Sequence, residues 1–175
     1  MKLTFKNDTF KILQIADTQE GRKVSPDTLA LINAALDREE PDLVVYSGDQ
    51  IWGRGFHGDV NQVRRVLKEL TAPVVERHLP FAICFGNHDR QVGLDNRAQF
   101  EIYKAITGFI GEDTPGVDGV GNCVLEIADG DRPGYLLYLI DSHSSLKVGY
   151  DHVHQNQIDW YRGVRDSYEK QYGHT

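Results

Sequence analysis

Residues 79–89 form the sequence Leu79-Pro80-Phe81-Ala82-Ile83-Cys84-Phe85-Gly86-Asn87-His88-Asp89. The first seven residues are a short apolar run, which is typical of a buried strand. An amide, an imidazole and a carboxylate follow at the carboxyl end of that run, where open α/β sheets bind their ligands. We therefore predict a functional site at residues 86–89.

Two earlier segments have the same arrangement. The apolar run 10–16 leads into Asp17-Thr18-Gln19, and the run 43–47 leads into Gly48-Asp49-Gln50. Asp and Asn also favour turns after strands, but that alternative explains one such motif and not three. We expect three strands to deliver oxygen and nitrogen donors to one edge of a sheet.

The segments between these runs predict helices. Ser25-Pro26-Asp27 is a strong helix start, with a capping hydroxyl and a proline at the first helical position, and Pro41 ends this helix. Residues 59–70 carry apolar side chains at helical spacing, which predicts a second helix. The resulting β-α-β-α-β order implies a parallel sheet with right-handed crossovers.

The rest of the chain predicts further elements around this unit. Residues 3–5 and 10–16 are expected to pair as a hairpin across Asn7-Asp8. After residue 89 we expect a helix over 96–106, a long loop over 108–119, an antiparallel hairpin of strands 123–128 and 135–140, and a closing helix over 155–172. Cys84 and Cys123 lie in apolar segments without metal-ligand spacing, so we expect reduced core cysteines.

Composition indicates one globular domain over residues 1–175. The chain has 40% hydrophobic and 26% charged residues, enough to build a core. The formal charge of −7 argues against a broad nucleic-acid surface, because phosphate backbones are bound by clustered Lys and Arg. The amino-terminal residues lack the apolar segment of a signal peptide, and no stretch is long enough to span a bilayer. We therefore expect a cytoplasmic protein without membrane contact.

The motifs Asp17-x-Gln19, Gly48-Asp49 and Gly86-Asn87-His88-Asp89, in this order, resemble the first three motifs of the calcineurin-like metallophosphoesterases. Residues 119–127 and 139–144 are similar to later strands of the Dcr2-type, purple-acid-phosphatase-like branch. The resemblance implies an α/β fold, a sandwich of two mixed β-sheets flanked by helices, here without its carboxyl-terminal strands.

The resemblance also implies a chemistry: metal-dependent hydrolysis of a phosphomonoester or phosphodiester, with a metal-bridging hydroxide as nucleophile. It implies two divalent metal ions. Asp17 and Gln19 bind the first ion, Asn87 binds the second, and Asp49 bridges both. His88 stands beside the phosphate, where it stabilises the phosphoryl oxygens or protonates the leaving group.

The sequence departs from the family pattern in two ways. Gln19 stands where the family usually has histidine, and its harder amide oxygen favours Mn²⁺ or Fe over Zn²⁺. The lone histidine of a fourth motif and the final G-H-x-H of the family have no counterpart. We interpret the chain as the amino-terminal portion of a longer protein or as a product of truncation.

Other polar residues have alternative interpretations. Arg54 and His143 are candidates for substrate contact, the alternatives being a mobile loop around Arg54 and a turn stabilised by Asp141. His152 and His154 precede a predicted helix, where positions two apart point to different faces, so we expect two solvated histidines.

Two functions from other classes remain as alternatives to the phosphoesterase. One is a non-catalytic binding or scaffold protein of the same fold, or an inactive fragment with an incomplete metal site. The other is a nucleotide-binding α/β domain, although no strand leads into a phosphate-binding glycine loop. The expected partner is a phosphorylated substrate, and missing strands would leave an unpaired sheet edge that favours self-association.

Overall fold

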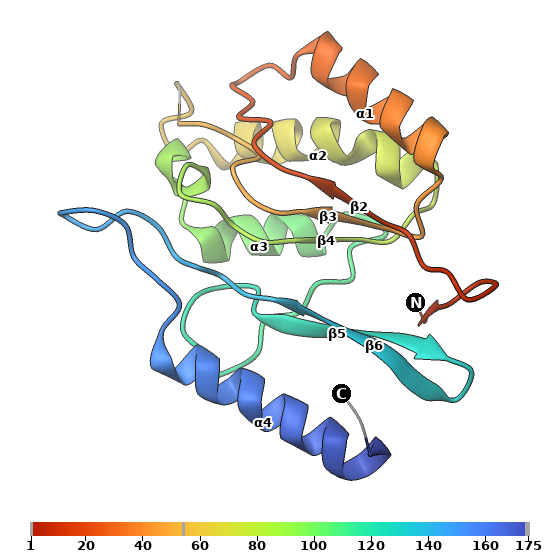
Figure 1. Cartoon of the computed structure of the whole chain (residues 1–175). Coiled ribbons are helices and arrows are strands. Elements are labelled where there is room, and N and C mark those ends of the chain that lie inside the picture. The colour runs from red at the N-terminus through yellow and green to blue at the C-terminus, as the bar shows by residue number, and fades with distance from the viewer. Residues whose placement is uncertain (1, 54, 174–175) are drawn as a thin grey trace.

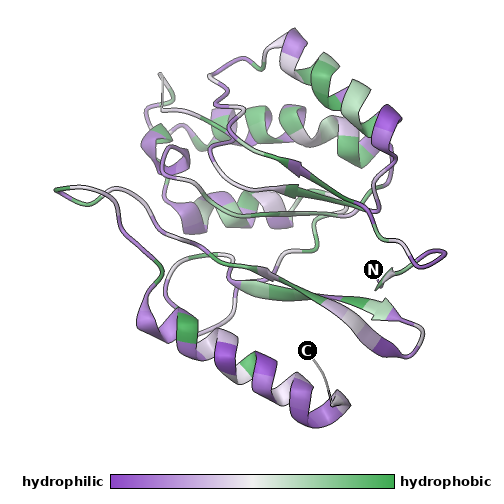
Figure 2. Ribbon diagram, viewed as in Figure 1, coloured by the Kyte–Doolittle hydropathy of each residue, from purple (hydrophilic) through white to green (hydrophobic). Residues whose placement is uncertain are grey.

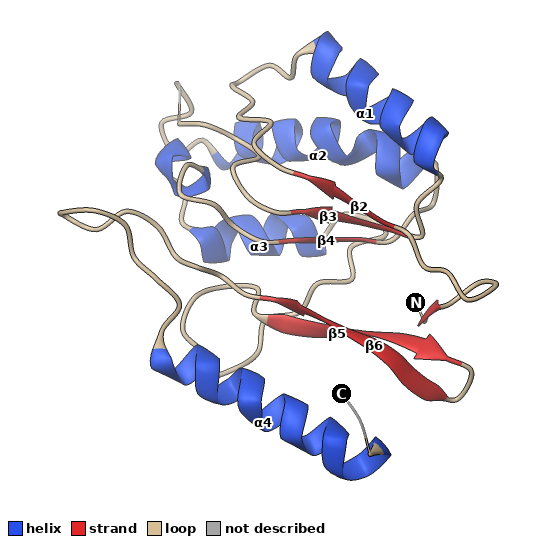
Figure 3. Cartoon of the chain, in the orientation of Figure 1, coloured by secondary structure: helices blue, strands red, loops and turns tan. Residues whose placement is uncertain are grey.

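The computed structural model describes residues 2–53 and 55–173. Two three-stranded sheets face each other, and helices lie on their outer sides (Figures 1 and 3). One sheet has the order β2 (Ile12–Ile15), β3 (Leu43–Tyr46) and β4 (Phe81–Ile83); the other has the order β1 (Leu3–Thr4), β5 (Cys123–Asp129) and β6 (Arg132–Leu139). This arrangement confirms the predicted α/β sandwich.

The sheet β2-β3-β4 is parallel throughout. Ile15 pairs with Tyr46, and Tyr46 pairs with Ile83, so the carboxyl ends of the three strands are aligned. The crossovers are α1 (Pro26–Glu39) and α2 (Val60–Glu76), which confirms the predicted β-α-β-α-β order.

Both crossover helices begin where the capping residues predict. The Ser25 side chain accepts a hydrogen bond from the Asp27 amide at 3.2 Å, and Asp59 caps α2 in the same way. α2 continues past residue 70, through Pro73, to Glu76. Thr71, Pro73 and Val74 are all buried in this added turn, so tertiary packing outweighs the helix-breaking tendency of proline.

The buried apolar residues form two layers of core. Figure 2 shows hydrophobic residues on the strands of both sheets and along α1 and α2. The larger layer lies between sheet β2-β3-β4 and its helices and includes Tyr46, Leu70 and Phe81. The second layer lies between the sheets, where Val45 of β3 and Ile127 of β5 belong to one cluster. Strand side chains alternate between faces, so β3 contributes to both layers.

The predicted amino-terminal hairpin is wrong. Lys6 and Thr9 exchange two backbone hydrogen bonds, of 2.8 and 3.0 Å, and close a turn. Leu3, however, pairs in parallel with Ile127 of β5. Its side chain is buried between the sheets, so the turn passes the chain from one sheet to the other.

The second half of the chain follows its prediction closely. α3 (Asn96–Lys104) and α4 (Gln155–Tyr172) form as expected, and β5 pairs with β6 in antiparallel fashion. The connecting turn is shorter than predicted, because β6 already begins at Arg132. α4 lies on the outer side of this sheet, with the ring centroids of Tyr138 and Tyr161 4.8 Å apart. Among the described residues, no helix combines the length and apolar character needed to cross a membrane.

Candidate metal centre at three strand ends

The first two motifs lie side by side beyond the ends of β2 and β3. The amide of Asp17 donates to the carbonyl of Gly48 at 3.1 Å, and the amide of Gln19 donates to the carbonyl of Asp49 at 2.9 Å. These hydrogen bonds connect the two segments as a ladder does within a sheet. The prediction that the strand ends gather their motifs at one edge therefore holds for this pair.

Three of the four predicted metal ligands have a left-handed backbone. The φ angles are +55° for Asp17, +46° for Gln19 and +54° for Asp49. This conformation is uncommon for residues other than glycine, and it persists only where the surrounding structure enforces it. Such residues cluster at functional sites, and here they cluster on the two adjacent motifs.

The second and third motifs are in direct contact. The amide of His88 donates to Oδ1 of Asp49 at 2.8 Å. A Cβ atom on Gly86 would overlap that same carboxylate and lie 2.6 Å from the Asp49 nitrogen, so only glycine fits there. Asn87 is held between these two residues and is thereby placed beside Asp49.

The Asp89 side chain connects the second motif to the third through hydrogen bonds to their backbone amides. Its side chain is 1% exposed. Oδ2 accepts from the amides of Gly86 at 2.7 Å and Asp49 at 2.9 Å, and Oδ1 accepts from Gln50 at 2.9 Å and Ile51 at 3.2 Å. Burial raises the pKa of Asp89 to about 6, while the N–H donors of Gly86, Ile51 and Asp49 oppose the rise.

The resemblance assigns no ligand or catalytic role to Asp89. The signal that could have found it is an aspartate three residues after a glycine, because Asp side chains accept backbone N–H groups in turns. The structure shows that this carboxylate positions Asp49 and the Gly86 segment.

The side chains of the predicted metal ligands are free to bind an ion. Within the described part of the chain, the carboxylate of Asp17 and the amides of Gln19 and Asn87 make no hydrogen bond, and Asp49 uses one oxygen. Gln19 and Asn87 are half-buried, so their amide groups can be reached by a bound ion. Two carboxylates and two amide oxygens at one edge fit a hard divalent cation.

His88 lies at the same edge with a fixed ring orientation. Its Nδ1 is 3.0 Å from Oε1 of Gln91, and its ring centroid is 5.5 Å from that of Trp52. Since the amide oxygen accepts, Nδ1 carries a proton and Nε2 is left for another partner. This arrangement suits a group that gives or accepts a proton.

Of the two residues predicted to contact substrate, the structure describes only His143. Arg54 lies outside the described residues. His143 follows β6, and its neighbour Ser144 donates through Oγ to the Asn87 carbonyl at 3.3 Å, which places this segment next to the third motif. The Nε2 atom of His143 pairs with Oε1 of Gln157 at 2.9 Å, so its ring is held against the start of α4.

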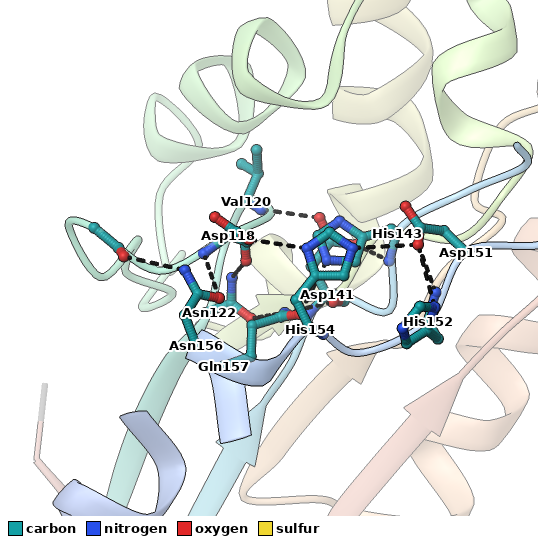
Figure 4. Close-up of polar contacts among 11 residues, drawn as sticks. Asp118, Val120, Asn122, Asp141, His143, Asp151, His152, His154, Asn156 and Gln157 are labelled. Carbon is teal, nitrogen blue, oxygen red and sulfur yellow. Dashed lines mark hydrogen bonds and ion pairs between the residues drawn. The ribbon is translucent and has the colours of Figure 1, made fainter. Parts of the chain in front are cut away.

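The prediction for His152 and His154 is half right. The His152 side chain is 81% exposed, as expected. The prediction that His154 is solvated is wrong. Its ring stacks on His143 with centroids 4.1 Å apart and contacts two aspartates (Figure 4). It caps α4 from the preceding loop, so the helical spacing that separates such side chains does not apply.

Comparison with known proteins agrees with the motifs. Residues 10–172 match the family model described as calcineurin-like phosphoesterase. Phosphatase DCR2 of Saccharomyces cerevisiae is 30% identical over 90% of this chain, and a probable inactive purple acid phosphatase 14 of Arabidopsis thaliana is 27% identical over 91%. Phosphodiesterase YaeI of Escherichia coli is 34% identical over 54% of this chain and 34% of its own length. The resemblance to the Dcr2-type, purple-acid-phosphatase-like branch is confirmed.

The matches differ in how much of each relative they cover. The chain spans 32% of the length of DCR2 and 48% of the Arabidopsis protein. The range matched by the family model, residues 10–172, contains all three motifs described above.

Proposed function

Because the chain belongs to the calcineurin-like phosphoesterase family, we propose that it hydrolyses phosphomonoesters or phosphodiesters with divalent metal ions. The ions bind Asp17, Gln19, Asp49 and Asn87. The observation that carries this proposal is a set of ligand atoms at one sheet edge: among the described residues the side chains of Asp17, Gln19 and Asn87 have no hydrogen-bond partner, and Asp49 has one oxygen left. Three of these residues also have a left-handed backbone.

Each residue has a role that its contacts support. Asp49 lies between the other motifs, since its carbonyl accepts from Gln19 and its Oδ1 accepts from His88, so it suits a ligand shared by two ions. Divalent ions lower the pKa of bound water and offset negative charge on the phosphoryl oxygens. When both of its ring nitrogens carry a proton, His88 donates through Nε2 to a phosphoryl oxygen or protonates the leaving group.

Charge at the site favours an anionic substrate. Two divalent ions carry more positive charge than the carboxylates of Asp17 and Asp49 can offset, and the amides of Gln19 and Asn87 add no charge. The edge would therefore be electropositive although the whole chain has a formal charge of −7.

The direct test is hydrolysis by the purified chain. Loaded with Mn²⁺, it should hydrolyse p-nitrophenyl phosphate, bis(p-nitrophenyl) phosphate or both, and EDTA should abolish the reaction. If the chain retains Mn²⁺ in equilibrium dialysis and hydrolyses neither ester, the non-catalytic binding protein is the correct function. That second candidate is favoured by the names of relatives that are probable inactive purple acid phosphatases.

Metal preference tests the role of Gln19. Replacing this amide oxygen with an imidazole nitrogen in Gln19→His should shift the ratio of Zn²⁺ to Mn²⁺ affinity by about tenfold toward Zn²⁺. Isothermal titration with each metal measures the ratio. The control is Gln14→His on β2, whose side chain hydrogen-bonds to Ser47. An unchanged ratio in Gln19→His would remove Gln19 from the ligand set.

A self-association interface is proposed at β2. This strand is the edge of its sheet, and Ile12 on it is 40% exposed, features that favour edge-to-edge pairing. The mass from light scattering should rise with concentration, and Ile12→Lys should restore the monomer mass. Val148→Lys is the control, because Val148 is 87% exposed in a distant loop. A monomer mass at all concentrations for the unaltered chain would refute the interface.

A further inference from the structure

A second group of metal-ligating side chains lies outside the motif residues. His143 follows β6, and Asp151 and His154 lie at the other end of the loop that leads into α4 (Figure 4). One nitrogen or carboxylate oxygen from each of the three lies within 4.8 Å of the others. We infer that His143, Asp151 and His154 bind a divalent cation of the zinc class, at a site distinct from the motif centre.

The spacing of two ligand atoms suits such an ion. Nε2 of His154 is 3.2 Å from Oδ1 of Asp151. Zinc–nitrogen and zinc–oxygen bonds of ~2.1 Å at a tetrahedral angle place two ligand atoms about 3.4 Å apart. A zinc ion can therefore replace the proton between these two atoms with little movement of either side chain.

Gln157 fixes the tautomer of His143. Gln157 is fully buried, and its Nε2 donates to Oδ1 of Asn122 at 2.9 Å and to the Asp141 carbonyl at 2.7 Å. Its Oε1 must then accept, and it faces the His154 amide at 2.7 Å and Nε2 of His143 at 2.9 Å. His143 consequently carries its proton on Nε2 and its lone pair on Nδ1, which is the nitrogen that would bind a metal.

Asp118 determines which nitrogen of His154 carries the proton. Its Oδ2 is 2.9 Å from Nδ1 of His154, which favours the proton on Nδ1 and leaves Nε2 for the ion. A carboxylate behind a metal-binding histidine also increases the basicity of the ligand nitrogen. The rings of His143 and His154 are stacked with their centroids 4.1 Å apart, so one ring has to turn before both lone pairs can point at one ion. The site then has two histidine ligands, each with a second residue behind it, and one carboxylate ligand.

Three protein ligands leave the fourth coordination position of a tetrahedral zinc ion open. His143 and Asp151 line a cavity of about 300 Å³ that Arg90 and Asp141 also line. Zinc sites with three protein ligands hold water or another small ligand in the fourth position. The cavity gives that ligand access from solvent, at a place where Ser144 contacts Asn87.

Site-specific NMR tests the inference on the full chain. Zinc, which is diamagnetic, is added while the imidazole ¹⁵N signals are followed, each assigned by a His→Gln variant. Nδ1 of His143 and Nε2 of His154 should shift together and saturate at one ion per site, while the signals of His78 should not move. If the His143 and His154 signals stay in place up to millimolar zinc, the site does not exist.

Matched variants define the ligand set. His154→Gln should weaken zinc binding at this site about tenfold or more, whereas His78→Gln, at an exposed position outside the cluster, should have little effect. An equal loss in both variants would overturn the assignment. Asp49→Asn should leave the zinc-induced shifts of His143 and His154 unchanged, so failure of the proposed phosphoesterase function would not affect this test.

Discussion

Asp49→Asn should lower Mn²⁺-dependent phosphoester hydrolysis by about 1,000-fold, equivalent to about 4 kcal/mol of transition-state stabilisation. Asp49 is 8% exposed and contacts both neighbouring motifs. Asn has the same shape and can still accept from the His88 amide, so the fold should be retained. What the variant loses is the negative charge that a ligand shared by two divalent ions requires.

The measurement pairs activity with metal content. Ions retained after equilibrium dialysis are counted by elemental mass spectrometry for the unaltered chain and for Asp49→Asn. Asp59→Asn is the matched control, because Asp59 caps α2 through its side-chain oxygen and Asn is an equally good cap. Retention of full metal content and activity in Asp49→Asn would exclude Asp49 as a ligand.

The strand ends were predictable because local sequence specifies them. Each motif follows an apolar run, and parallel strands align their carboxyl ends, so Asp17, Asp49 and Asn87 were expected at one edge. The helices α1 and α4 were also predictable, since caps and periodic apolar residues lie within the segments themselves.

Other features depend on contacts that local sequence does not contain. Leu3 pairs with Ile127. The sequence of the two-residue strand β1 does not identify this pairing partner, which lies far along the chain. His154 meets His143 only because the loop after β6 returns to the same place. The left-handed backbone at Asp17 and Gln19 is likewise imposed by hydrogen bonds to the next strand end.

Asp89→Asn should destabilise the chain by about 3 kcal/mol, because an amide nitrogen would replace one of two buried acceptor oxygens. Each oxygen of Asp89 accepts from two backbone amides. Whichever way the Asn side chain is turned, its NH₂ group faces two of these donors, which lose their acceptor inside the protein. The destabilisation therefore does not depend on the metal.

Urea unfolding in the presence of EDTA measures this effect without any contribution from bound ions. Asp95→Asn is the control, since Asp95 caps α3 by accepting from the Ala98 amide at 2.7 Å and Asn can do the same. A loss below about 1 kcal/mol in Asp89→Asn would mean that the four hydrogen bonds do not hold the motifs together. The expected loss of unfolding free energy would instead show that one buried carboxylate holds the Asp49 and Gly86 segments in place. Asp89→Asn should then also weaken Mn²⁺ binding, although Asp89 is not a metal ligand in this proposal.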